Sequence, residues 1–179
     1  MPVDLCNAQA AGEAILEVLV QSQPQDNDLL SRAQLREKLN QQLQSALGSA
    51  TDLFIFGSEV AGILRRDSDM DLCVTTGHSL EGSLSRKHQQ EVLTDISKVL
   101  KRDYPHSILI SHARIPILKV EGRTPPHFDI CCNWPGVRNS HFLRHYVENY
   151  PTKIQPLATA VVLLAKNNGI HGAKHQGLK

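Results

Sequence analysis

The chain has 179 residues, enough for one domain with its own core or for one domain and the beginning of another. Its 19 basic and 18 acidic residues give a formal net charge of +1, so any contact with nucleic acid must be local. No apolar run is long enough to cross a bilayer, and the N-terminus lacks the pattern of a secretory signal. We therefore expect a soluble, cytoplasmic protein without a membrane partner, and we leave a mitochondrial location open.

The chain contains four irregularly spaced cysteines: Cys6, Cys73, Cys131 and Cys132. The last two are neighbours, which cannot easily bridge each other, so we expect reduced thiols. His127 and His141 together with this cysteine pair could suggest a zinc site. Adjacent side chains on a strand face opposite ways, however, so buried core thiols are the favoured interpretation.

Helical periodicity dominates the N-terminal part of the chain. Residues 8–21 crowd their apolar side chains toward one side and predict a first helix. Residues 28–47 predict a longer amphipathic helix, because leucine recurs at every fourth position from 35 to 47 and Gly48 follows as a C-cap. We expect this second helix to pack on a sheet.

Short apolar runs in the middle of the chain predict strands. They cover residues 53–56, 71–76, 107–110, 115–121 and 127–133, and a helix is expected over 84–101. The first run is wholly apolar, which suits a strand that is buried on both faces.

Two more helices are expected after Pro135-Gly136, over residues 140–150 and 154–168. The second is strongly apolar, with Pro156 in its first turn, and we expect it to have neighbours on most sides, among them a possible protein partner. The order of elements predicts an α+β fold with a mixed sheet and helices on one face.

Three acids in two predicted strands form the candidate site. Asp69 and Asp71 project to one side of a strand while Met70 and Leu72 point into the core. Like charges held this close raise a pKa unless a divalent cation neutralises them. If the strand that carries Asp129 lies alongside, the three carboxylates could hold two Mg²⁺ ions for phosphoryl transfer.

Gly57-Ser58 follows the first predicted strand and begins a short predicted helix over residues 59–64. The glycine lets the backbone approach closely, and the serine hydroxyl, the amides and the helix dipole converge. This segment is a candidate anion site for a triphosphate.

In this order and spacing, the Gly-Ser pair, the Asp-x-Asp motif and the distant third acid resemble the nucleotidyltransferase superfamily of DNA polymerase β. Three further stretches resemble the noncanonical poly(A) polymerases and terminal uridylyltransferases: residues 113–119, residues 128–130 with 136–140, and residues 163–166. The resemblance implies an N-terminal helical segment (1–27), a polymerase β-like palm as the catalytic domain (28–137) and the beginning of a helical second domain (138–179).

The resemblance also implies metal ligands. Asp69 and Asp71 match the acids that bind both metals, and Asp129 matches the acid that binds the metal activating an RNA 3′-hydroxyl. The implied cofactor is Mg²⁺, with Mn²⁺ as an alternative.

For the substrates, the resemblance assigns a role to each matching position. Gly57 and Ser58 hold the β and γ phosphates, Asn139 contacts the ribose, Ser140 lies near the phosphates, Lys166 neutralises the triphosphate, and Arg114 and Lys119 touch RNA phosphates. A second lysine expected one turn before Lys166 is replaced by Val162.

The function that this resemblance implies is terminal uridylyl transfer: UMP moves from UTP to an RNA 3′ end and pyrophosphate leaves. One rival is a noncanonical poly(A) polymerase that uses ATP. Another is an inactive or truncated fragment that binds a partner through the helix at 154–168. The family's base-stacking tyrosine lies past a Gly-Leu pair, matched here by Gly177-Leu178, so we expect the base-reading region to be absent.

Structural explanations compete with some of these assignments. Asp129 could be a buried acid paired with Arg114 or Arg138. Lys166 could be an ordinary helix-end lysine near the C-terminal dipole. Trp134 could stack on a base, although a packing anchor is the favoured interpretation.

Overall fold

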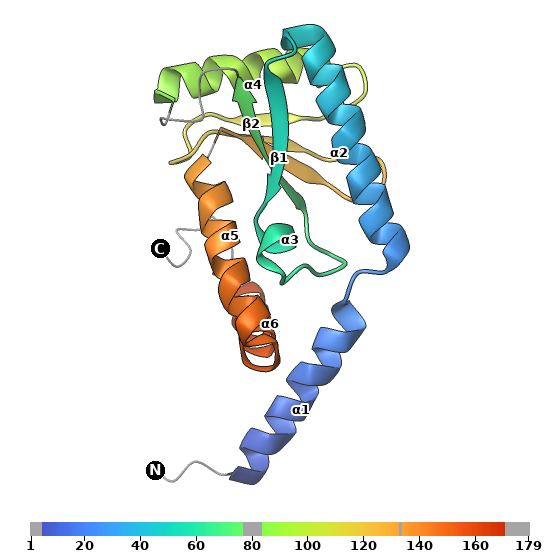
Figure 1. The fold of residues 1–179 in the computed structure, drawn as a ribbon, viewed down its shortest axis with the longest axis vertical. Coiled ribbons are helices and arrows are strands. Elements are labelled where there is room, and N and C mark those ends of the chain that lie inside the picture. Colours follow the sequence, from blue (N-terminus) through green and yellow to red (C-terminus); the bar gives the residue numbers. More distant parts are fainter. Residues whose placement is uncertain (1–4, 77–83, 133, 171–179) are drawn as a thin grey trace.

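The computed structural model describes residues 5–76, 84–132 and 134–170. Its elements are α1 (Leu5–Ser22), α2 (Asp26–Leu47), β1 (Thr51–Phe56), α3 (Ser58–Ala61), β2 (Met70–Thr76), α4 (Arg86–Leu100), β3 (Ile108–Ile110), β4 (Ile117–Val120), β5 (Phe128–Cys131), α5 (Trp134–Asn149) and α6 (Pro151–Asn167). Each predicted helix and strand has a counterpart among them. In Figure 1, α1 extends beyond the sheet and lies next to α6. The expectation about Gly177-Leu178 lies outside the described residues.

The five strands form one mixed sheet in the order β1-β2-β5-β4-β3. β2 and β5 run parallel, whereas the other neighbouring pairs run antiparallel. Parallel neighbours need a long connection, and here α4, β3 and β4 supply it. The α+β fold with a mixed sheet is confirmed.

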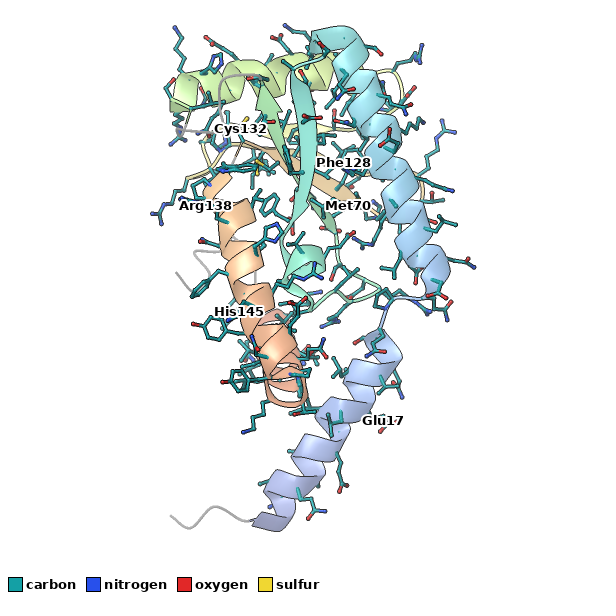
Figure 2. All side chains as sticks on the ribbon, viewed as in Figure 1. Glu17, Met70, Phe128, Cys132, Arg138 and His145 are labelled. Carbon is teal, nitrogen blue, oxygen red and sulfur yellow. The ribbon has the colours of Figure 1, made fainter. Side chains whose placement is uncertain are left out.

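The core lies between the sheet and the two helices α2 and α4. It consists of Leu39, Leu43, Leu53, Met70, Leu72, Val74, Leu93, Ile96, Leu100, Leu118, Val120, Phe128, Ile130 and Cys132. On β2, β4 and β5 these residues occupy alternate positions, so the residues between them point to the opposite face of the sheet. Met70 and Phe128, labelled in Figure 2, are fully buried in this core.

α5 and α6 begin earlier than the sequence predicts. α5 starts at Trp134 instead of residue 140, because Pro135 in the first turn of a helix needs no backbone N–H partner. α6 starts at Pro151 for the same reason, so Pro156 lies inside the helix and not in its first turn. The sequence prediction therefore placed the starts of both helices several residues too late.

α5 and α6 attach directly to the sheet and to α3. The ring of Trp134 meets the ring of Phe54 on β1 edge-on, with centroids 5.1 Å apart, which agrees with a packing anchor. The side-chain amide of Gln155 on α6 donates to the carbonyl of Gly62 at 2.9 Å. The predicted domain boundaries, 27/28 and 137/138, fall within α2 and α5, and the division into domains stays a prediction.

The outer face of α6 is apolar and exposed. Leu157, Val161 and Leu164 are 62%, 51% and 64% exposed and lie one turn apart. Among the described residues α6 thus lacks the neighbours on most sides that its composition predicts. No helix in the described ranges combines the length and the apolar character that a bilayer span requires.

Polar residues of α2 hold the edge strand β1. The backbone N–H of Leu53 donates to Asn40 Oδ1 at 3.0 Å, and Arg36 Nε donates to the carbonyl of Leu53 at 3.1 Å. Leu53 is fully buried, so both backbone groups require partners. α2 therefore acts as the neighbour that β1 lacks on this side.

Replacing Asn40 should destabilise the fold by leaving the buried N–H of Leu53 without an acceptor. We expect Asn40→Ala to lower the free energy of unfolding by about 1–3 kcal/mol in urea titrations. Gln44→Ala is the matched control, since Gln44 bonds the exposed side chain of Asp52 from the same helix. Equal losses for the two variants would contradict this account of the strand edge.

Candidate active site

Two of the predicted acids meet on neighbouring strands, whereas Asp69 lies just before β2 and not on the strand as predicted. β2 and β5 pair in parallel with Asp71 opposite Asp129, and β5 pairs with β4 so that Asp129 lies opposite Lys119. All three residues occupy positions that alternate with core residues, so they share the sheet face opposite the core. The condition for a shared carboxylate site, that the two strands are neighbours, is fulfilled.

Gly57 lies directly against Asp71. A Cβ at this position would lie 2.0 Å from Asp71 Oδ2, and the backbone φ of +69° disfavours any other residue. The N–H of Gly57 donates to Ser140 Oγ at 2.8 Å, and the hydroxyl of Ser140 donates to the carbonyl of Gly136 at 2.9 Å. Ser140 therefore positions Gly57 from α5, and a direct contact with phosphates stays a prediction.

A cleft of about 850 Å³ opens in front of this sheet face. Its lining combines strand residues (Asp71, Ile110, Ile117, Lys119, Asp129), residues between β1 and β2 (Ser58, Ile63, Arg65, Asp67, Ser68, Asp69), the pair His112 and Ala113, and residues of α6 (Ala158, Thr159, Val162, Lys166). The structure thus brings together the three acids, Ser58, Lys119 and Lys166. Arg114 and Asn139 are exposed and do not line the cleft.

Negative charge is concentrated at Asp71. Burial raises the pKa of Asp71 to about 6, the charges of Asp129 and Asp69 add to the shift, and Arg32 opposes it. Carboxylate oxygens are the ligands that Mg²⁺ prefers, so the donor set fits a divalent cation. Among the described residues, however, no three His, Cys, Asp or Glu side chains lie close enough to one another to share one ion.

Lys119 contacts one of the three acids. Its ammonium lies 3.6 Å from Asp69 Oδ2, and both side chains are partly exposed in the cleft. The lysine predicted to touch RNA therefore also compensates the charge of a predicted metal ligand.

Arg32 is a site residue that the sequence prediction did not include. Its side chain is 3% exposed, its Nη1 lies 3.1 Å from Glu59 Oε2, and its Nη2 donates to the carbonyl of Ser68. It thereby links α2 to α3 and to the segment before Asp69. A signal was present, since Arg32 lies on the same helix face as Leu39 and Leu43, where a charged residue is unexpected.

The structure also bears on the alternative assignments of the cysteines and of Lys166. Cys73, Cys131 and Cys132 are buried and unbridged, which confirms core thiols, whereas the side chain of Cys6 is not among those described. Lys166 lines the cleft and its ammonium lies 3.1 Å from Asp67 Oδ2, a setting that an ordinary helix-end lysine does not require. Asp67 was also missed, because its partner lies 99 positions away in the sequence.

Comparisons with known proteins identify a family for this chain. The family model of the "Poly(A) RNA polymerase, mitochondrial-like, central palm domain" matches residues 12–148. Poly(A) RNA polymerase GLD2 of Danio rerio is 30% identical over 167 residues, 90% of this chain and 33% of that protein. Terminal uridylyltransferase 4 of Homo sapiens is 35% identical over 154 residues, 83% of this chain and 9% of that protein.

A solved structure shows the same fold. Terminal uridylyl transferase 4 from Trypanosoma brucei with bound dUTP superposes with a TM-score of 0.78 at 21% identity, covering 94% of this chain and 53% of that one. The chain spans about a third of the length of the first curated relatives it matches.

Gly57→Ala should displace Asp71, because the added methyl group occupies the position of its carboxylate. Gly169→Ala is the matched control, since Gly169 has a similar φ of +66° and open space around it. We expect both variants to lose about 1 kcal/mol of stability from backbone strain. Only Gly57→Ala should also weaken Mn²⁺ binding, measured by electron paramagnetic resonance, and equal Mn²⁺ affinities would contradict the contact.

The raised pKa of Asp71 predicts a pH dependence of stability without metal. The folded state binds the proton more tightly than the unfolded state, so this contribution is present below pH 4 and is lost as the pH rises through about 6. Between pH 4 and 7, unfolding free energies in EDTA should fall by up to about 3 kcal/mol relative to those of Asp71→Asn. A constant difference between the two proteins would contradict the raised pKa.

Proposed function

This chain belongs to the family of the poly(A) RNA polymerase, mitochondrial-like, central palm domain, and we propose that it carries the catalytic site of an RNA terminal uridylyltransferase. The proposed reaction transfers UMP from UTP to an RNA 3′-hydroxyl and releases pyrophosphate. The observation that supports it most directly is the register of β2 and β5, which sets Asp71 beside Asp129 in a cleft bordered by Ser58.

Under this proposal the three acids are the metal ligands. Asp69, Asp71 and Asp129 would hold two divalent cations, Mg²⁺ with Mn²⁺ as an alternative, whose chemistry is to stabilise charge on the attacking and departing oxygens. Gly57 supports the arrangement because it keeps the backbone close to Asp71. Arg32 also supports the arrangement, because its guanidinium donates to the carbonyl of Ser68, the residue before Asp69.

The same cleft offers groups for the nucleotide. Ser58 and the backbone of Gly57 would bind the β and γ phosphates, and Lys166 would neutralise them from α6. The chain's contribution is then positioning and electrostatics in a partly enclosed space. Asn139 at the ribose and Arg114 at the RNA backbone remain proposals that require movement or further contacts, since both side chains are exposed outside the cleft lining.

Lys119 has two roles in this proposal. It compensates Asp69 in the structure, and it would move to an RNA phosphate when a cation takes over that carboxylate. Both roles would use the same ammonium group, because the long lysine side chain can change its rotamer.

ATP and UTP are both candidate substrates for this cleft. The relatives include proteins named as poly(A) RNA polymerases as well as terminal uridylyltransferases, so ATP is the competing substrate. A partner-binding role is the third candidate, and the exposed stripe of Leu157, Val161 and Leu164 on α6 favours it.

Primer extension separates these candidates. The 179-residue chain, and any longer natural product that contains it, should be incubated with Mg²⁺, a labelled RNA and each nucleoside triphosphate in turn. We expect extension with UTP and at least a hundredfold loss in Asp129→Asn, because a carboxylate ligand is removed; the order of magnitude follows from losing a charge-stabilising contact. Asp95→Asn on α4 is the control for the same chemical change far from the cleft.

Each outcome of this assay has a clear meaning. Preferential use of ATP would replace the uridylyl assignment with the poly(A) polymerase. Absence of extension with all four nucleotides would favour the partner-binding role.

A further inference from the structure

Asp67 is held between two cations that come from different elements. Arg65 donates to it twice, Nε to Oδ1 and Nη2 to Oδ2, each at 3.1 Å. From α6, Lys166 Nζ donates to Oδ2 at 3.1 Å. None of the sequence assignments gives Asp67 a role, although it lines the cleft two positions before Asp69.

These two cations are arranged as an anion site. Arg65 has a side chain that is only 12% exposed, and its remaining terminal nitrogen, Nη1, is buried without a hydrogen-bond partner among the described residues. A buried guanidinium N–H without an acceptor is costly, so Asp67 satisfies only part of the hydrogen-bonding capacity of Arg65. One carboxylate for two cations leaves the group formed by Arg65, Asp67 and Lys166 with one uncompensated positive charge.

The side chain of Asp67 contacts both cations at hydrogen-bonding distance. Asp67 therefore presents carboxylate oxygens to the two cations, as a phosphate group would present its own oxygens.

We propose, on the basis of the proposed function, that Asp67 takes the place of the nucleotide's phosphates on Lys166 and Arg65 and so limits how tightly the cleft binds a triphosphate. A triphosphate that reaches Lys166 must displace Asp67 or share the ammonium with it, and the two anions repel each other. Asp67 also links α6 to the segment that carries Asp69, so this exchange removes one of the links between them and leaves the Gln155–Gly62 hydrogen bond in place. Asp67 is thus an affinity-determining residue of the cleft and does not itself contact the reacting atoms.

The sign of the expected effect distinguishes this role from a structural one. Asp67→Asn keeps the size of the side chain and one oxygen for Arg65, but it removes the competing charge. Since a partly exposed ion pair contributes about 1 kcal/mol at most, we expect inorganic triphosphate to bind about three- to fivefold more tightly to the variant. A residue that only supports the fold would weaken binding when replaced.

The experiment is an isothermal titration of the 179-residue chain with inorganic triphosphate in EDTA, which removes metal binding from the measurement. Asp95→Asn controls for the change in net charge, because Asp95 pairs with Lys98 in an exposed position on α4. Lys166→Met provides the second arm: it should weaken binding, and Asp67→Asn should give a smaller gain in its presence, because only Arg65 is then left to be freed. Thermal unfolding of each variant confirms that it is folded.

Tighter binding by Asp67→Asn that depends on Lys166 supports the proposal. Equal binding, weaker binding, a matching gain in Asp95→Asn, or no binding by either protein contradicts it. Because the probe lacks a base and a transferable nucleotide, the result is independent of primer extension. A gain in triphosphate affinity without RNA extension would therefore retain the role of Asp67 and reject uridylyl transfer.

Discussion

The alternation of side chains along β2 and β5 is the constraint on which the site depends. Met70 and Leu72 on β2, like Phe128 and Ile130 on β5, point into the core. The residues between them, Asp71 and Asp129, consequently point to the other face, and the parallel register sets them opposite each other. Core packing and carboxylate placement are therefore two results of one register, and a shift by a single residue would exchange them.

Polar contacts from α2 and α5 also hold β1 and the segments that flank the cleft. α2 contributes Arg36 and Asn40 to the edge of β1 and Arg32 to the segments that flank the cleft. From the other side, Ser140 on α5 fixes the amide of Gly57. Each of these contacts ties a helix to β1 or to the segment between β1 and β2.

Local pattern was sufficient for the elements and for the acids, but not for their partners. Asp71 and Asp129 could be found because acids within apolar strands are conspicuous in a sequence, Asp69 because it forms an Asp-x-Asp motif with Asp71, and the Gly57-Ser58 pair because it directly follows a buried strand. The contacts of Arg32 with Glu59 and of Asp67 with Lys166 join distant segments, so no local spacing encodes them. The starts of α5 and α6 were placed too late because a proline can either break a helix or occupy its first turn, and the local sequence does not distinguish the two cases.

The parallel pairing of β2 with β5 also bears on how the protein is made. α4, β3 and β4 must all be synthesised before β5 can join β2, so the site depends on contacts between segments that are remote in the chain. Such non-local pairing forms slowly compared with helices and hairpins. A ribosome-bound chain that has emerged only as far as β4 contains the Gly57-Ser58 segment and Asp71 but lacks Asp129, so the proposed site is still incomplete at that stage of synthesis.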